Sequence, residues 1–174
     1  DVIDLFYLHR VDHRIPVEES VGAIDQLISQ GKVRYAGLSE VSQSTLERAR
    51  SVTTIHALQS EYSLWSRRVE EDILYYCRDH GIALVAYSPV GRGFLAGGVR
   101  KMIQLSERDI RHGMPRFQGN AFENNLRVLE QVELLGLRWG MTLAQVCLNW
   151  LWSRGEHVGA IPGTTNLSHW RDDQ

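Results

Sequence analysis

The chain has 174 residues and a formal net charge of -2, with 43% hydrophobic and 23% charged residues. These totals fit one soluble domain that buries roughly 70% of its unfolded surface. They give no reason to expect nucleic acid or a membrane as a partner, because the net charge is small and no apolar stretch approaches the ~20 residues of a bilayer span. We therefore expect a cytoplasmic protein in which Cys77 and Cys147 are buried free thiols.

The first half of the chain alternates apolar runs with amphipathic stretches. Residues 4–9 form an almost wholly apolar run, as in a strand that is buried on both faces of a parallel sheet. A helix with one apolar stripe is predicted next, with Gly31 as its left-handed C-cap, and residues 33–39 predict a second strand. The spacing of Ser44 and Glu47 predicts a capping box that opens the following helix.

The same alternation continues further along the chain. Residues 55–59 predict a third strand, an acidic cluster at 70–72 opens a helix that Gly81 ends, and residues 82–87 predict a fourth strand. The stretch 91–120 is too long for an ordinary connection. We interpret it as a loop that covers a site and contains one helical turn.

The last part of the chain predicts two helices, near residues 124–137 and 143–153, and the second begins with the capping-box pattern Thr142-x-x-Gln145. A fifth strand at 158–162 and a short closing helix follow. Strands that alternate with helices form a parallel sheet, so the predicted fold class is α/β, in one domain or part of one.

Each predicted strand stops at a polar residue. These strand ends are His9, Ser39, Gln59, Tyr87 with Ser88, and Gly163 with Thr164. The carboxyl ends of parallel strands lie at one edge of a sheet, where α/β proteins place their reactive groups. The pattern therefore predicts five contributions to a single site.

Each of these residues also has an ordinary structural interpretation. The neutral imidazole of His9 can donate a hydrogen bond to a carbonyl oxygen that gains negative charge, or it can be a solvated strand-end residue. Gln59 and Ser39 can bind a carboxamide, or they can satisfy a turn. Tyr87 can stack on a flat ring, and Arg92 can bind phosphate, or they can be a core tyrosine and a surface arginine. The residues alone leave these alternatives open.

Several segments together closely resemble the aldo-keto reductase family. They are Asp-Leu-Phe-Tyr-Leu-His-Arg at 4–10, Gly-Lys-Val-Arg-Tyr-Ala-Gly-Leu-Ser-Glu at 31–40, Gln-Ser-Glu-Tyr-Ser-Leu-Trp at 59–65, Ala-Tyr-Ser-Pro-Val-Gly-Arg-Gly-Phe-Leu at 86–95 and Ile-Pro-Gly-Thr-Thr at 161–165. They recur in order over nearly the whole chain. The stretch 114–119 is similar to the branch of general bacterial and plant reductases that act on aldehydes and ketones.

The resemblance implies a (β/α)8 TIM barrel that binds NADP(H) in extended form at its carboxyl face. Residues 1–174 are then the C-terminal portion of a single barrel domain, an incomplete barrel covering about strands four to eight. The Asp, Tyr and Lys of the family's catalytic tetrad are expected on the missing strands, and His9 is the tetrad histidine that orients and polarises the substrate carbonyl. Tyr7 lies ~6.6 Å deeper on the same strand and is rejected as a replacement proton donor.

The resemblance also implies the cofactor-binding residues. Ser39, Glu40 and Gln59 are implied to hold the nicotinamide carboxamide, with Tyr87 stacked on the ring. The remaining implied positions lie along the pyrophosphate (Ser88, Val90 and Arg92) and around the adenosine phosphate (Gly163, Thr164, Thr165, Asn166, His169 and Asp173).

Four of these positions depart from the common family pattern. Glu40 stands where many relatives have Asn. Asn166, His169 and Asp173 replace a frequent Lys, Arg and Asn, which weakens the preference for NADP(H), although Arg171 can supply a cation nearby. NAD(H) therefore stays open as an alternative cofactor.

We expect the parent protein to reduce small-molecule aldehydes and ketones by hydride transfer from NADP(H). This stretch alone is expected to be inactive, because a positioned proton donor typically contributes roughly 10²–10⁴-fold. The alternative function is a noncatalytic nucleotide-sensing subunit, like the channel β subunits of the same fold. No metal site is expected.

Overall fold

A five-stranded sheet forms the centre of the fold. The computed structural model describes residues 1–101 and 105–172. All neighbouring strands pair in parallel, in the order β1-β2-β3-β4-β5. Their bounds are Ile3–Leu8 for β1, Val33–Ser39 for β2, Ile55–Glu61 for β3, Ala83–Tyr87 for β4 and Val158–Ile161 for β5. This arrangement confirms the predicted α/β class and the predicted parallel sheet.

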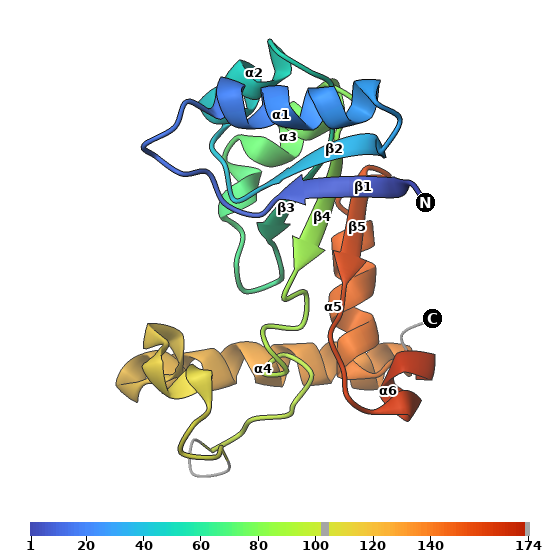
Figure 1. Cartoon of the computed structure of the whole chain (residues 1–174). Coiled ribbons are helices and arrows are strands. Elements are labelled where there is room, and N and C mark those ends of the chain that lie inside the picture. The colour runs from blue at the N-terminus through green and yellow to red at the C-terminus, as the bar shows by residue number, and fades with distance from the viewer. Residues whose placement is uncertain (102–104, 173–174) are drawn as a thin grey trace.

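Helices cover one face of this sheet. Figure 1 shows α1, α2 and α3 gathered on one side of the strands, with α5 alongside β5 and α4 running across the far end of α5. The bounds are Val17–Ser29 for α1, Gln43–Arg50 for α2, Ile73–Asp79 for α3, Gly119–Trp139 for α4, Leu143–Trp152 for α5 and Leu167–Asp172 for α6. None of the described helices is long and apolar enough to cross a bilayer.

The main hydrophobic core lies between the sheet and these helices. Alternate strand residues such as Leu38, Leu58 and Leu84 point toward the helices and are fully buried. Residues on the opposite face are more open: the side chains of Leu5 and Tyr35 are 38% and 49% exposed. Apolar residues on the open face are what an incomplete barrel presents where further strands are missing, and β1 and β5 have free edges.

A second core lies away from the sheet, where the long connection after β4 packs on α4 and α5. Phe94, Phe117 and Phe122 form a ring cluster with centroid separations of 5.8 to 6.5 Å. Instead of the single predicted turn, the described part of this connection contains two short 3-10 helices, η3 (Ile110–Gly113) and η4 (Pro115–Phe117). Aromatic burial therefore makes it a packed segment.

Helix boundaries test the predicted caps. The Thr142–Gln145 capping box is confirmed, with both reciprocal hydrogen bonds formed. The predicted box at Ser44 is wrong, because the hydroxyl of Ser42 accepts the hydrogen bond that caps α2. At α3 the acidic cluster divides: Asp72 is the cap, while Glu70 ends a preceding 3-10 helix, η1 (Arg68–Glu70).

Other boundaries agree with prediction or shift by a few residues. Gly31 and Gly81 have positive φ angles of 70° and 66°, as left-handed helix ends require. The helix α4 begins at Gly119, earlier than predicted. Both cysteines are free and buried, and burial raises the pKa of the Cys77 and Cys147 thiols to about 12.

Candidate functional site

The strand register places the predicted site residues side by side. Ser39 lies opposite Gln59, and Glu61 lies opposite Tyr87. Because paired residues of parallel strands point to the same face, Ser39, Gln59 and Tyr87 all lie on the open face at the carboxyl edge. His9 directly follows β1, which pairs with β2 through Tyr7 and Gly37, so His9 continues the same row. Its side chain is exposed, and its imidazole has no hydrogen-bond partner among the residues that the structure describes.

Ser39 is the most enclosed polar member of this row, with 2% of its surface exposed. Its hydroxyl oxygen accepts a hydrogen bond of 3.0 Å from the guanidinium of Arg10. The same guanidinium nitrogen donates to the carbonyl oxygen of His9 at 2.6 Å. Arg10 therefore links the ends of β1 and β2. The sequence analysis missed it, although its position beside His9 was an available signal.

Glu40 links the end of β2 to the end of β3 through two hydrogen bonds. Its backbone N–H donates to the carbonyl oxygen of Gln59 at 2.9 Å, and its carboxylate accepts from the N–H of Glu61 at 2.8 Å. The side chain is exposed, so the other carboxylate oxygen can still accept a hydrogen bond. A carboxylate can accept from the amide N–H of a carboxamide, but it cannot donate to the carboxamide oxygen.

The amide group of Gln59 is better suited to that double role. It is half-buried on the open face, and within the described part of the chain it has no hydrogen-bond partner. Tyr87 lies nearby and is also half-buried. Burial, followed by the charges of Glu40 and Glu61, raises the pKa of the Tyr87 phenol, whereas the charge of Arg10 lowers it. Tyr87 is therefore neutral at physiological pH and presents an uncharged ring.

The backbone is strained at three of the predicted positions. Glu40, Ser88 and Arg92 have φ angles of 55°, 51° and 56°, a region that side-chain-bearing residues rarely adopt. They are the three non-glycine residues with positive φ in the described ranges 1–101 and 105–172. Such conformations concentrate at binding and catalytic sites, where the surrounding structure holds them in place.

A cavity of about 320 Å³ joins two segments that are far apart in the sequence. It is lined by Val90 and Gly93 from the connection after β4, and by Gly163, Thr164 and His169 from the connection after β5 and from α6. One predicted pyrophosphate residue, Val90, thus shares a cavity with three predicted adenosine-phosphate residues, Gly163, Thr164 and His169.

Hydrogen bonds within the last segment hold its shape. Asn166 donates its backbone N–H to the Thr164 hydroxyl at 3.1 Å, and its side-chain oxygen accepts from the N–H of Ser168 at 2.9 Å. The neighbouring Thr165 is exposed. Asp173, the remaining predicted residue, lies outside the described residues.

Arg92, like Ser88, Thr165 and Asn166, is not part of the lining of that cavity. Its carbonyl oxygen accepts a hydrogen bond of 2.9 Å from Arg111, and it lines a separate cavity of about 200 Å³ with Glu61 and Arg116. Arg116 forms a 2.9 Å ion pair with Glu61, and its guanidinium lies 5.0 Å from the ring centroid of Trp65. The long connection is thereby fixed to the carboxyl end of β3.

A sequence profile of the aldo/keto reductase family matches residues 1–173. The chain belongs to this family. Its fold resembles a glycerol dehydrogenase from Gluconobacter oxydans, with a TM-score of 0.91 and 28% identity. Two aldo-keto reductase structures from Klebsiella pneumoniae, one with NADPH and one with NADP and acetate, match with TM-scores of 0.72 and 0.71 and identities of 26% and 27%.

These comparisons also fix the extent of the match. The three alignments cover 98 to 99% of this aldo-keto reductase chain, but 52% of each matched structure. The chain therefore spans about half the length of the relatives it matches. This share agrees with an open five-stranded sheet in place of a closed barrel.

Within this aldo-keto reductase fold, Tyr7 is unsuited to proton transfer at the strand ends. It packs against Gly37, and its hydroxyl is buried without a hydrogen-bond partner among the described residues. Burial also raises the pKa of the Tyr7 phenol. Its position below the carboxyl edge agrees with the rejection made from the sequence.

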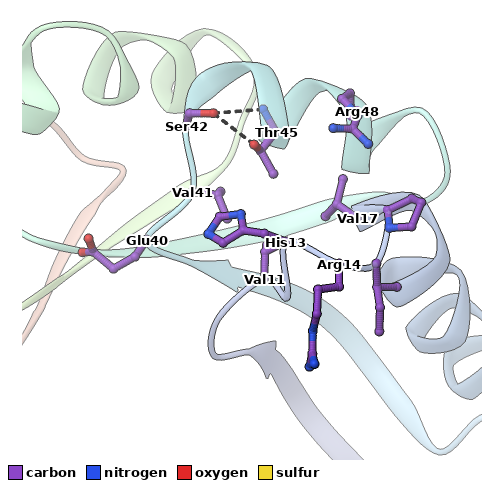
Figure 2. Close-up of a pocket in the computed structure, with 11 residues that line it drawn as sticks. Val11, His13, Arg14, Val17, Glu40, Val41, Ser42, Thr45 and Arg48 are labelled. Atoms are coloured by element: carbon purple, nitrogen blue, oxygen red, sulfur yellow. Dashed lines mark hydrogen bonds between the residues drawn. The ribbon is translucent and has the colours of Figure 1, made fainter.

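A further cavity, of about 520 Å³, lies on the rim outside this row (Figure 2). It is formed by the connections that lead into α1 and α2, and Glu40 is the one predicted site residue in its lining. Two arginines of the lining are already paired, Arg14 with Asp12 and Arg48 with Glu18. Among the described residues, no three His, Cys, Asp or Glu side chains gather to hold a metal ion.

Proposed function

We propose that the whole protein is an NADP(H)-dependent oxidoreductase that reduces aldehydes and ketones, and that residues 1–174 are the C-terminal portion of its single barrel domain. The observation that carries this proposal is the common row of Ser39, Gln59 and Tyr87 on the open face at the carboxyl edge. Family membership and the Klebsiella structures with NADPH and NADP support the same conclusion.

The residues of the row fit a nicotinamide. The hydroxyl of Ser39 and the amide of Gln59 offer a donor and an acceptor for its carboxamide, and the neutral ring of Tyr87 offers a stacking surface. When bound, the cofactor supplies the hydride that reduces the carbonyl carbon. His9 is proposed to hydrogen-bond the substrate carbonyl oxygen, where negative charge develops.

The rest of the dinucleotide is proposed to follow the strained backbone away from this row. Ser88 and Val90 lead from the end of β4 toward the cavity shared by Gly163, Thr164 and His169. Among the described residues that line this cavity, His169 has the one titratable side chain. We propose that an adenosine 2'-phosphate binds more weakly in this cavity than at a site with two permanent cations. The affinities for NADH and NADPH are therefore proposed to differ less than in relatives with Lys and Arg at these positions.

Cofactor titration of the purified chain tests the proposal. We expect saturable NADPH binding, measured through quenching of tryptophan fluorescence. Replacing Tyr87 with Ala is expected to weaken binding by roughly 3- to 10-fold, the usual contribution of one aromatic stack. Tyr75→Ala is the matched control, because Tyr75 is an exposed tyrosine on α3, on the helix-covered side of the sheet.

Equal affinities for the wild-type chain and the Tyr87 variant contradict the proposed site. The proposal also has a catalytic arm. The chain by itself is expected to show negligible reduction of 4-nitrobenzaldehyde by NADPH, because Tyr7 does not replace the missing proton donor. Turnover at an ordinary enzymatic rate contradicts this expectation.

A further inference from the structure

Arg10 links two strand ends, one that the proposed function assigns to the substrate carbonyl and one that it assigns to the nicotinamide. Its guanidinium donates to the His9 carbonyl oxygen at 2.6 Å and to the Ser39 hydroxyl at 3.0 Å. Its charge also reaches Tyr87 at the end of β4, where it lowers the pKa of the phenol against the opposing effects of burial and two carboxylates. The guanidinium therefore contacts Ser39 directly and lies within electrostatic range of Tyr87.

The hydrogen bond from Arg10 fixes the role of the Ser39 hydroxyl. A guanidinium only donates, so the Ser39 oxygen acts as the acceptor in this contact. The hydroxyl proton is then free to point elsewhere. Because Ser39 is 2% exposed, the directions available to this proton are few, and the open face is the side from which a ligand can approach. The arrangement makes Ser39 a donor toward a ligand oxygen.

The charge of Arg10 also distinguishes the two forms of the cofactor. The oxidised nicotinamide ring carries a positive charge, whereas the reduced ring is neutral. A fixed guanidinium at the rim repels the oxidised ring, and the carboxylates of Glu40 and Glu61 attract it. Glu40 and Glu61 are tied to each other by a backbone contact, and Glu61 is paired with Arg116. The ion pair of Glu61 with Arg116 weakens the field of Glu61, whereas the carboxylate of Glu40 acts on the row together with Arg10. Arg10 therefore offsets part of the attraction that the two carboxylates exert on the oxidised ring.

We propose that Arg10 is a positioning residue that orients the Ser39 hydroxyl toward the nicotinamide carboxamide and opposes the attraction of Glu40 and Glu61 for the oxidised cofactor. This inference rests on the proposed function, because it requires a nicotinamide at the row. Arg10 is not assigned a part in bond making.

The test is the ratio of two dissociation constants, Kd for NADP+ divided by Kd for NADPH, measured on the whole chain. Arg10→Met is expected to lower this ratio by roughly 2- to 5-fold, the range found for interactions between solvent-exposed charges. Arg10→Lys keeps the charge, so it restores the ratio, but it lacks the planar fork and restores only part of the NADPH affinity.

Arg14→Met is the matched control for net charge. Arg14 lies four positions further along, its side chain is 87% exposed, and it pairs with Asp12 outside the row. Its removal is expected to leave the ratio unchanged. A double-mutant cycle with Ser39→Ala tests the link to Ser39: the loss of NADPH affinity from Ser39→Ala is expected to be smaller in the Arg10→Met background than in the wild-type chain. Circular dichroism checks that each variant is folded.

The outcomes separate the two claims. If the wild-type chain does not bind NADPH, the proposed function fails and the inference fails with it. If the wild-type chain binds but Arg10→Met leaves the ratio unchanged, or Arg14→Met lowers it equally, the inference alone is overturned. Additive losses in the cycle with Ser39→Ala overturn the positioning role, since they show that Arg10 does not act through Ser39.

Discussion

The strained backbone at Glu40 predicts that glycine stabilises the fold relative to alanine at this position, whereas the order is reversed at Glu47. Glu40 has a φ of 55°, and its carboxylate accepts the N–H of Glu61 at 2.8 Å. Glu40→Ala loses this hydrogen bond and keeps a side chain in the left-handed region. Glu40→Gly loses the same hydrogen bond but removes the left-handed cost, which is about 1–2 kcal/mol for a residue with a Cβ. The glycine variant is therefore expected to be the more stable by about 1 kcal/mol.

Glu47 gives the matched comparison. It is exposed within α2 and accepts a hydrogen bond from Gln43, which both substitutions remove equally. Glycine inside a helix is less stable than alanine by about 1 kcal/mol. Glu47→Gly is therefore expected to be less stable than Glu47→Ala, the reverse of the order at Glu40.

Urea unfolding followed by tryptophan fluorescence measures all four variants. A difference of 1 kcal/mol moves the midpoint by about 0.5 M urea for a slope near 2 kcal/mol per M. If the glycine variants are the less stable at both positions, Glu40 is not held in the left-handed region and the argument for stored strain at the strand end fails.

Three further predictions concern the open face and the cores. Gly37→Ala is expected to lower the free energy of unfolding by about 1–3 kcal/mol, because the new Cβ lies 2.5 Å from the Tyr7 ring, whereas Gly159→Ala meets no atom within 4 Å; equal midpoints in urea contradict this. Cys77 and Cys147 are expected to resist a thiol reagent at about pH 8 until denaturant is added, and rapid labelling of the folded chain refutes this. Because burial raises the pKa of each thiol from 9.0 to about 12, the free energy of unfolding is expected to fall as pH rises from 9 toward 12. The free edges of β1 and β5 are expected to promote self-association, so a sedimentation coefficient that does not change with concentration counts against exposed edges.

Local patterns predicted much of the fold, since strands and caps depend on neighbouring residues. The bounds of β2 and the capping box of Thr142 follow directly from sequence spacing. The cap at Ser42 was missed because Thr45 stands where a capping box has Glu or Gln, and the hydroxyl alone forms the cap. The strand β3 extends past Gln59 to Glu61, since pairing with Tyr87 continues the ladder that the apolar pattern did not reveal.

Contacts between distant segments account for what the sequence analysis left out. The ion pair of Glu61 with Arg116 and the bond of Arg10 to Ser39 join residues that are 55 and 29 positions apart. The cavity lined by Val90 and His169 depends on where α6 lies relative to the connection after β4. No local periodicity encodes such pairs. The row of strand ends itself was predictable, because parallel pairing alone brings the carboxyl ends of the strands to one edge.

Amide hydrogen exchange with and without NADPH tests the central claim most directly, namely that the strand ends form one dinucleotide site. The account predicts slower exchange on NADPH addition at 39–41, 59–61 and 87–93, the segments around the row and the first turn after β4. Exchange at α1 and α2, on the other face of the sheet, is predicted to stay unchanged. Protection confined to residues 11–17 and 42–48 of the rim cavity, with none at 59–61 and 87–93, contradicts the account.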